Sequence, residues 1–578
     1  MVSLSVLYTS KAKDFCYALL KCDLARRNDI ITTEDIFGHM FQEFPDDSEW
    51  DAVIIGAGPN GLMAAAYLAK AGLKVALVER RYEIGGGLAT EEILYPCYSS
   101  NPHVIYHMMV DYMPVIRDFN LDGPSLLWVK PNAQTAMVFE DGKSLLLTHM
   151  IEDTKDSISK FSFKDAVNFG KVMRSWRRIV DEIVAPATYV PPSAPIEMTM
   201  ALQKTKVGQD MLELIEQSPL EIITHTFEND CVRALMLYAS CMWGLDPRET
   251  GIGFFVPLLL DRGMNKCYCY GGSHKFASAM GREIVKAGGL ILEHAEVSKI
   301  IMHNGKATGV ELAEGRTLRS KVVVSTLDPH TTFLDLVGAQ HLGKDFKDLI
   351  DGWKYDKWSF YTLHVASEEP PRYKCDDPWV NDAFMTIFGI ESTEQLLAHW
   401  DNVVAGKIGH HFGGHATCET LLDPHLSDKP GKHISFFQMH APYEIQGGWE
   451  KKSKEMEEAI LAKWHRVAPN MKRENIIMTV HETPVDIETR FPNMRRGGIK
   501  HGDYRPIQLG SFRPNQECSS TRTPIEGLYV CGVSTYPGGL VLGGSGYLGA
   551  NKVAEDLEVK KWWKPTVEIE RYIKTYLE

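Results

Sequence analysis

The chain has 578 residues, of which 44% are hydrophobic and 24% charged, a composition typical of folded globular proteins and unlike that of disordered or fibrous chains. Its formal net charge of −13 at pH 7 gives no basic surface for a polyphosphate backbone, so the charge argues against nucleic acid as a partner. The longest apolar run, residues 252–260, is too short to cross a bilayer, and 11 cysteines without a CxxC pair favour a reducing compartment. We therefore expect a cytoplasmic protein.

The first elements in chain order are a helical extension and a β-α-β unit. The pattern of residues 1–48 predicts a helical N-terminal extension. A strand at 51–55, a helix at 62–71 that ends at Gly72, and a second strand at 74–79 follow it. This arrangement predicts the start of a parallel sheet covered by a helix.

The turn between the first strand and its helix contains a GxGxxG pattern. Gly56, Gly58 and Gly61 allow a tight turn, a close approach of the backbone to a pyrophosphate, and close helix-strand packing. The helix directs its positive N-terminus at the phosphates, and Glu79 after the next strand is placed to accept hydrogen bonds from ribose hydroxyls. The alternative is a glycine turn with a structural role only. The predicted dinucleotide-binding residues here are Gly56, Gly58, Pro59, Asn60, Gly61 and Glu79.

A second glycine cluster follows Glu79 closely. It begins at Arg80 and contains Gly86 and Gly87. Such a cluster looks like the extension of glutathione-reductase-like and amine-oxidase-like flavoproteins, where it wraps the pyrophosphate and leads toward the flavin. Nicotinamide dehydrogenases generally lack it, so this resemblance implies FAD, with Arg80, Gly86 and Gly87 among its contacts.

The rest of the chain alternates between helical and strand patterns. Residues 110–250 predict a helical insertion, and strand signals return at 290–324. Strands at 359–365 and 433–439 predict a second sheet. The expected domains are the extension 1–48, a discontinuous FAD-binding domain at 49–110, 270–330 and 520–557, a substrate domain at 111–269 and 331–519, and a tail at 558–578.

The end of the chain carries a family resemblance. Thr523–Gly532, Tyr536–Gly539 and Gly543–Gly549 are similar to the closing motif of the phytoene desaturase and carotenoid isomerase family. Asp423-Pro and Arg513-Pro look still closer to the PYROXD2-like branch of that family. The resemblance covers about residues 50–557 and implies an α/β, two-lobe flavoprotein with a GxGxxG doubly wound FAD-binding domain and an interleaved, mixed α+β substrate domain.

The resemblance also implies an activity and further cofactor contacts. The expected enzyme is an FAD-dependent dehydrogenase or desaturase that passes a hydride from a hydrophobic, terpenoid-like substrate to flavin N5. A helix that begins after Gly543 would direct backbone N–H groups at the flavin, where negative charge collects on reduction. The further cofactor contacts are Val297, whose main chain matches the family position at the adenine, and Gly532, Leu542 and Gly543.

Candidate catalytic residues are less distinct. His501 and Asp503 form a candidate acid-base pair, and a structural turn is an equal alternative. Asn101 and His103, shortly after the second glycine cluster, are weaker candidates for the flavin's surroundings. We expect no metal site, because the histidines near Gly413 lack further residues at ligand spacing and fit a solvated loop better. These histidines are His410, His411 and His415.

Several functional alternatives stay open at this point. The same scaffold can serve a flavin-dependent isomerase, an amine oxidase-like enzyme or a catalytically silent, flavin-stabilised interaction protein. The electron acceptor is unidentified, and a homo- or hetero-oligomer is consistent with the pattern. Two adjacent tryptophans among lysines in 559–577 predict either a peripheral membrane contact or packing of the tail on the parent fold or on a second subunit.

Overall fold

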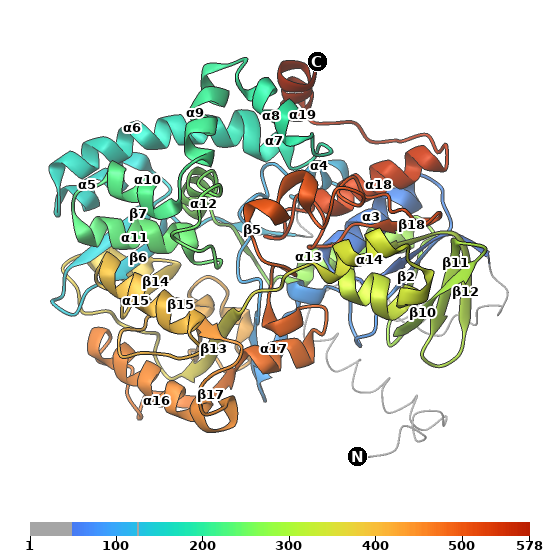
Figure 1. Cartoon of the computed structure of the whole chain (residues 1–578). Helices are drawn as coiled ribbons and strands as arrows, with labels where there is room; N and C mark the ends of the chain where they lie inside the picture. Colours follow the sequence, from blue (N-terminus) through green and yellow to red (C-terminus); the bar gives the residue numbers. More distant parts are fainter. Residues whose placement is uncertain (1–48, 124–125) are drawn as a thin grey trace. The chain divides into compact units, whose positions relative to one another are not determined.

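The computed structural model describes residues 49–123 and 126–578, so the helical extension predicted for 1–48 lies outside the described residues. Residues 49–578 form one compact unit, which is built around two large sheets (Figure 1). Together with the helices between and around them, these sheets make the α/β, two-lobe architecture that the sequence predicts.

The first sheet has seven strands and collects segments from distant parts of the chain. Its order is β10-β11-β12-β1-β2-β9, and β18 pairs with β12. The strands β12, β1, β2 and β9 run parallel, as β18 does to β12, whereas β10 and β11 form an antiparallel edge. Their bounds are β1 Glu49–Ile55, β2 Val75–Val78, β9 Leu290–Leu292, β10 Val297–His303, β11 Lys306–Leu312, β12 Thr317–Ser325 and β18 Leu528–Val530.

Helices α3 (Pro59–Lys70), α13 (His274–Lys286) and α18 (Gly544–Asp556) pack on this sheet. The helix α3 begins with proline at its first turn, which suits the fixed backbone angle of proline, and its alanines allow close packing. It runs beside α18 (Figure 1), and a Cβ atom on Gly546 would lie only 2.4 Å from the Asn60 carbonyl oxygen. The close approach of these two helices therefore depends on glycine.

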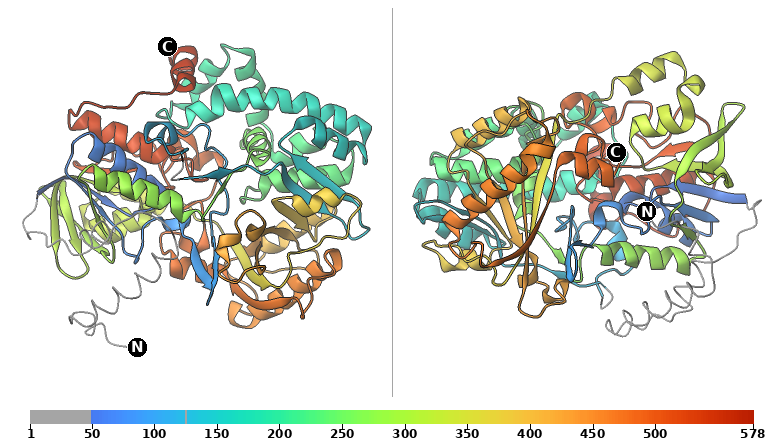
Figure 2. Two further views of the ribbon diagram at one scale, coloured as in Figure 1. Left: turned by 180° about the vertical axis from the view of Figure 1, so that it is seen from behind. Right: turned by 90° about the horizontal axis from the view of Figure 1, so that it is seen from below.

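The second sheet also has seven strands, in the order β17-β13-β16-β15-β14-β6-β7. The strands predicted at 359–365 and 433–439 are the antiparallel pair β13 and β16, which lies beside the edge strand β17. Figure 2 shows this sheet and its covering helices from two further sides. The bounds are β6 Ala133–Val138, β7 Ser144–Thr148, β13 Trp358–Ser367, β14 Met385–Phe388, β15 Gly414–Cys418, β16 His433–Pro442 and β17 Ile476–Glu482, with α15 Thr393–Val404, α16 Trp449–Val467 and α17 Pro484–Arg490.

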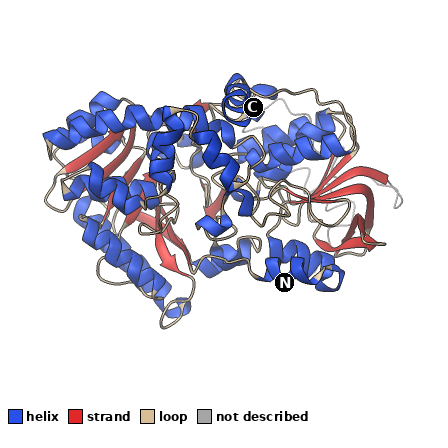
Figure 3. Cartoon of the chain, turned by 45° about the horizontal axis from the view of Figure 1, so that its top comes forward, coloured by secondary structure: helices blue, strands red, loops and turns tan. Residues whose placement is uncertain are grey.

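The helical insertion predicted for 110–250 is present but contains a hairpin. The strands β6 and β7 form this hairpin, with Gly142 at φ 85° in the turn, and β6 adds parallel to β14. Asp141-Gly142 between two apolar runs is a local hairpin signal that the helical interpretation of 110–250 overlooked. The helices of the insertion (Figure 3) are α4 Pro114–Asp118, α5 Ile151–Ser159, α6 Phe163–Ile179, α7 Ala185–Ala187, α8 Pro195–Leu202, α9 Lys206–Ile215, α10 Pro219–Thr226, α11 Asp230–Cys241 and α12 Phe255–Gly263.

The segment that follows the predicted domain boundary at 330 packs on the first sheet. The segments η4 (His330–Gly338) and α14 (Lys344–Asp351) belong to the stretch assigned to the substrate domain from residue 331 onward. In the structure η4 packs against β10 of the first sheet, and α14 packs against η4. Both segments thus pack with the first lobe, and the boundary at 330 stays a prediction.

The C-terminal tail packs on the parent fold. Trp562 stacks on Tyr67 of α3 at a centroid distance of 5.7 Å, and Trp563 lies 4.9 Å from the same ring with only 5% of its surface exposed. The helix α19 (Val567–Tyr572) buries Ile569 and Tyr572. These contacts agree with the alternative that the tail packs on the parent fold, and the membrane contact through 559–577 stays a prediction. None of the helices in 49–123 and 126–578 is long and apolar enough to span a membrane.

Candidate functional site

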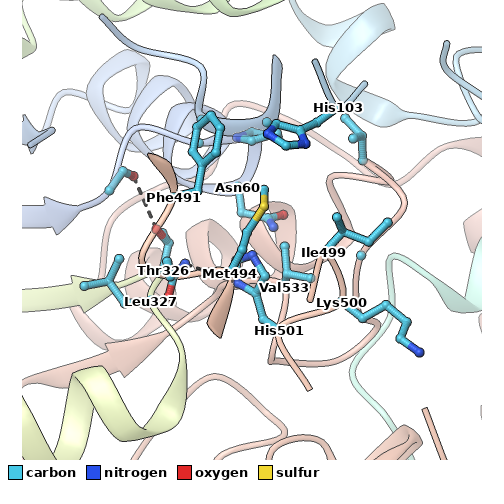
Figure 4. Close-up of a pocket in the computed structure, with 18 of the residues that line it drawn as sticks. Asn60, His103, Thr326, Leu327, Phe491, Met494, Ile499, Lys500, His501 and Val533 are labelled. Atoms are coloured by element: carbon cyan, nitrogen blue, oxygen red, sulfur yellow. Dashed lines mark hydrogen bonds between the residues drawn. The ribbon is translucent and has the colours of Figure 1, made fainter. Parts of the chain in front are cut away.

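A cavity of about 310 Å³ begins at the glycine turn after β1 and extends to side chains of the second lobe. Figure 4 shows His103 and Phe491 along one side, with Thr326, Val533 and His501 on the opposite side. Most of the predicted cofactor contacts line this cavity. They are Gly56, Gly58, Pro59, Asn60, Glu79, Arg80, Gly86, Gly87, Val297 and Leu542.

The two glycine clusters are in direct contact. The Gly85 amide donates to the Ala57 carbonyl oxygen at 2.8 Å, and a Cβ atom on Gly86 would lie 3.1 Å from the Gly58 Cα. Gly86 has φ 54°, in the left-handed region where glycine carries no penalty. The second cluster therefore folds back over the first turn and closes one side of the cavity.

The Glu79 carboxylate is buried and orders this end of the cavity. Its Oε2 accepts from the Ala57 amide at 2.9 Å, and its Oε1 accepts from the Arg81 amide at 2.9 Å. Each carboxylate oxygen has a second lone pair, so both can still accept from a ligand hydroxyl. The Ala295 amide donates to the Glu79 carbonyl oxygen at 2.7 Å, which brings the start of β10 and Val297 to the same place.

Three predicted cofactor contacts do not line the cavity and instead permit close packing. A Cβ atom on Gly61 would lie 1.9 Å from the Gly56 carbonyl oxygen, and one on Gly532 would lie 2.1 Å from the Thr326 carbonyl oxygen. Gly543 precedes α18 at φ 68°, with Met63 Sδ only 2.2 Å from a Cβ position. Their contribution to a cofactor site is indirect.

Two helix N-termini meet at the cavity. Neither α3 nor α18 is capped by the side chain of its own N-cap residue, so first-turn amides other than that of Gly546 can bind an anion. The Asn60 side-chain oxygen accepts from the Gly546 amide at 3.1 Å, and this bond joins the first turns of the two helices. The pairing concentrates positive helix-dipole charge at one wall of the cavity.

The loop before α18 has an unusual backbone. Leu540 and Val541, which both line the cavity, have φ values of 67° and 53°. A left-handed conformation is costly for a β-branched residue and is found mainly where surrounding structure enforces it, often at functional sites. The sequence motif predicts a glycine-rich loop here but gives no sign of these two positions.

The second end of the cavity is apolar. Tyr106 packs edge to face on Trp243 at 5.6 Å and on Phe384 at 5.7 Å, so its ring is held in place. Phe255 stacks on Tyr504 at 5.6 Å. The side chains that line this end are Tyr106, Met108, Trp243, Leu245, Phe255 and Leu259.

The candidate pair His501 and Asp503 is not brought together as an acid-base pair. His501 lines the cavity, and its Nδ1 lies 3.2 Å from Asn493 Nδ2. Asp503 is turned elsewhere, where its Oδ2 accepts from Arg505 Nε at 2.8 Å. The turn alternative therefore describes Asp503 better, because its carboxylate has no place among the cavity-lining residues.

Similar known proteins support the resemblance of this chain to flavoproteins. The model of the family described as flavin containing amine oxidoreductase matches residues 60–365. A relative from Castellaniella defragrans, named as one of the subunits of limonene dehydrogenase, is 36% identical over 90% of this chain and 97% of its own. The chain belongs to the flavin-containing amine oxidoreductase family. The protein is therefore an FAD-dependent oxidoreductase.

Further known proteins are also similar to most of this chain. The mouse pyridine nucleotide-disulfide oxidoreductase domain-containing protein 2 is 28% identical over 88% of this chain and 94% of its own. Phytoene desaturases also match, which confirms the predicted family resemblance. The fold is shared with cyclohexylamine oxidase from Brevibacterium oxydans, with a TM-score of 0.54, 16% identity, and 88% of this chain and 100% of that chain covered.

The residues of the cavity fit the FAD that the family carries. Two uncapped helix N-termini supply amides for phosphate oxygens, Glu79 keeps free lone pairs for ribose hydroxyls, and Gly58 has open space around its Cβ position. The apolar end begins where the glycine-rich loops finish. The cavity thus has a polar part for a dinucleotide and an apolar part for a second molecule.

Lys500 lines the cavity and was missed at the sequence level. Its Nζ lies 3.0 Å from Asp356 Oδ1 and donates to the Gly244 carbonyl oxygen at 2.6 Å. Burial raises the pKa of Asp356 to about 6, and Lys500 opposes that rise. No spacing pattern links Asp356 to Lys500, so only the folded chain could reveal the pair.

The weaker candidates are distributed over two places. His103 lines the cavity, and burial lowers its pKa to about 4. Asn101 donates to Glu419 away from the cavity lining.

His415 was expected in a solvated loop, but it is buried in β15 with its Nδ1 2.9 Å from the Tyr238 hydroxyl. Within 49–123 and 126–578 no cluster of three histidine, cysteine or acidic side chains is arranged to hold a metal ion.

Proposed function

We propose that the protein is a dehydrogenase of a small, hydrophobic, terpenoid-like substrate, acting by desaturation or by oxidation at an allylic carbon. Bound FAD supplies the chemistry by accepting a hydride at N5. The substrate loses this hydride together with a proton, which passes to water or to a side chain of the cavity wall. The relative named as part of limonene dehydrogenase supports the choice of substrate class.

The proposed roles of individual residues follow from their positions. Glu79 would accept from the adenosine ribose, and the main chain of Val297 would meet the adenine. The N-termini of α3 and α18 would bind the pyrophosphate and the electron-rich part of the flavin. The contacts from Arg80, Gly86 and Gly87 would close the second side of the cofactor.

The observation that carries the proposal is the apolar end of the cavity. Its walls are aromatic and aliphatic. Lys500 and Arg490, which also line the cavity, are already paired, Lys500 with Asp356 and Arg490 with Glu91 and Glu482. A charged amine would lose its hydration at such an apolar wall, so the cavity suits a neutral hydrocarbon better than the substrate of an amine oxidase. An isomerase that uses reduced flavin would need the same walls and remains the second candidate.

The proposal extends to partners. The electron acceptor is a separate molecule, and the limonene dehydrogenase relative, which is named as a subunit, supports a complex with a second chain.

A catalytically silent interaction protein would keep the cofactor contacts but would not need an apolar compartment beside them. The compartment therefore favours an active enzyme.

The test is anaerobic reduction of the purified holoenzyme, followed by the loss of flavin absorbance. We expect limonene to reduce the flavin and cyclohexylamine, a six-membered ring of similar size that carries an amine, to leave it oxidised. NADH is the third arm and should also leave it oxidised, because the chain has one GxGxxG fingerprint. Reduction by cyclohexylamine but not limonene would contradict the proposal.

A further inference from the structure

Hydrogen bonds around His501 fix which of its ring nitrogens carries the proton. The Asp328 amide donates to Asn493 Oδ1 at 2.6 Å, and this bond sets the orientation of the Asn493 amide group. Asn493 Nδ2 therefore faces His501 Nδ1 at 3.2 Å as a donor. Because Nδ1 accepts this bond, a neutral His501 must carry its proton on Nε2.

His501 stays neutral at physiological pH. Only 6% of its surface is exposed, and burial lowers its pKa to about 4, with Asp328 acting to raise it and the Arg513 guanidinium acting to lower it. Within the described residues 49–123 and 126–578, no protein group accepts a hydrogen bond from Nε2. The ring thus presents one fixed N–H donor at the cavity wall and cannot easily take up a proton.

The backbone holds this donor in position. His501 has φ 51°, its amide donates to the Gly498 carbonyl oxygen at 3.1 Å, and its own carbonyl accepts from Trp353 Nε1 at 3.2 Å. A left-handed conformation at a non-glycine residue is retained only where the surroundings enforce it. The side chain, the backbone and the tautomer are therefore all fixed before a ligand binds.

His501 lies at the wall of the cavity that the ends of β12 and β18 form. It lies opposite His103 and Phe491, beside Val533 (Figure 4), where β12 and β18 end. Thr326, on the same side, donates to the Ile55 carbonyl oxygen at 2.8 Å and so joins this wall to the glycine turn. Arg513 donates to the Val533 carbonyl oxygen at 3.2 Å and adds buried positive charge behind it.

We propose that His501 binds an oxygen atom of FAD, on its pyrophosphate or ribityl part, through Nε2–H, and that Asn493 is a positioning residue that keeps the ring in this tautomer. An oxygen-rich acceptor fits this wall, whereas a hydrocarbon substrate offers none. His501 would then be a cofactor-binding residue and not the base of the reaction. The inference rests on FAD as the cofactor and is independent of the proposed substrate.

The test measures the rate of FAD release from the holoenzyme at pH 8 without substrate. His501→Leu removes the donor, His501→Gln keeps an N–H at a similar reach, and Asn493→Asp attracts the imidazole proton to Nδ1. We expect the Leu and Asp variants to release FAD at least ten-fold faster and the Gln variant to stay within about three-fold of wild type. The control is His399→Leu, a buried histidine that does not line the cavity.

Two spectra sharpen the test. The ¹⁵N spectrum of histidine-labelled holoenzyme should place the His501 proton on Nε2, and Asn493→Asp should move it to Nδ1. The ³¹P spectrum of bound FAD should change in His501→Leu if the acceptor is a phosphate oxygen and stay unchanged if it is a ribityl hydroxyl.

Three outcomes would overturn the inference. Equal FAD release from wild type, His501→Leu and Asn493→Asp would remove the donor role, as would equal losses in the Gln and Leu variants. A wild-type ¹⁵N spectrum with the proton on Nδ1 would also reject it, and this measurement decides the matter even if the Leu variant fails to fold.

Discussion

The two ends of the cavity are built from different kinds of groups, backbone at one end and side chains at the other. The end near β1 uses main-chain amides, helix N-termini and glycines so closely packed that a Cβ atom on Gly61 would lie 1.9 Å from a backbone oxygen. The far end uses side chains such as Trp243 and Phe255, which come from separate helices and loops. Changes at the first end should therefore abolish cofactor binding, and changes at the second should alter substrate binding gradually.

The largest expected effect is at the glycine turn. Gly61→Ala places a methyl group against the Gly56 carbonyl oxygen, where neither backbone segment can move without opening the turn. We expect a purified protein with little or no flavin absorbance and a lower melting temperature. Gly263→Ala is the control, since nothing lies within 4 Å of its Cβ position. A yellow Gly61→Ala protein with normal stability would remove the contrast between the two ends.

The next effect is at the apolar end. Trp243→Ala removes a wall of the compartment and the edge-to-face contact with Tyr106. Losing the apolar surface that a large side chain buries against the substrate costs roughly 1.5–3 kcal/mol of binding, so we expect kcat/KM for the organic substrate to fall about 10- to 100-fold with FAD content unchanged. Trp379→Ala, at a half-buried tryptophan outside the cavity, should leave both quantities near wild type. Loss of FAD in Trp243→Ala would show that the two ends are not separable.

A smaller effect concerns the pH dependence of stability at His501. Burial lowers its pKa from the ordinary 6.5 to about 4, so the unfolded chain binds a proton there between these values and the folded chain does not. Stability is then complete above pH 6.5 and is lost as pH falls toward 4. Between pH 6 and pH 5 wild type should lose about 1 kcal/mol more than His501→Gln. Denaturant unfolding at the two pH values measures this difference, and parallel losses in both proteins would contradict it.

The smallest effect lies outside the cavity. Trp562 stacks on Tyr67, and Lys70 Nζ lies 3.7 Å from the centre of the Trp562 ring. We expect Trp562→Ala to leave flotation with anionic vesicles unchanged, because the ring is occupied by its own fold. A clear drop in flotation would instead return the tail to a membrane role.

The first end of the cavity could be predicted from sequence because backbone recognition demands glycine at fixed spacing. Gly56, Gly58 and Glu79 stand where the β-α-β pattern places them, and the structure brings them to one cavity. The same reasoning also chose Gly61, Gly532 and Gly543, which pack closely against the backbone or a side chain and do not line the cavity, because close packing and ligand contact require the same residue type. Only the folded structure shows whether a Cβ atom at a glycine position would clash with the protein or face open space. That difference separates a glycine needed for packing from one needed for ligand contact.

The second end left almost no signal in the sequence. Tyr106, Trp243 and Phe255 are ordinary core residues by pattern, and their shared wall depends on how the helical insertion packs. The pair of Lys500 with Asp356 joins segments far apart in the chain, and the tautomer of His501 depends on Asn493 and on the Asp328 amide. Hydrogen-bond direction has no counterpart in residue spacing.

The order of strands in the first sheet also has a consequence for synthesis on the ribosome. The glycine turn is made early, but β18 and α18, which complete its sheet and cover α3, are made only about 470 residues later. Until residue 556 has left the exit tunnel, the alanine face of α3 lacks its neighbour and the second helix N-terminus is missing. We therefore expect stable FAD binding only after α18 has been made, and a nascent chain that stalls before this helix would expose an apolar surface that favours aggregation.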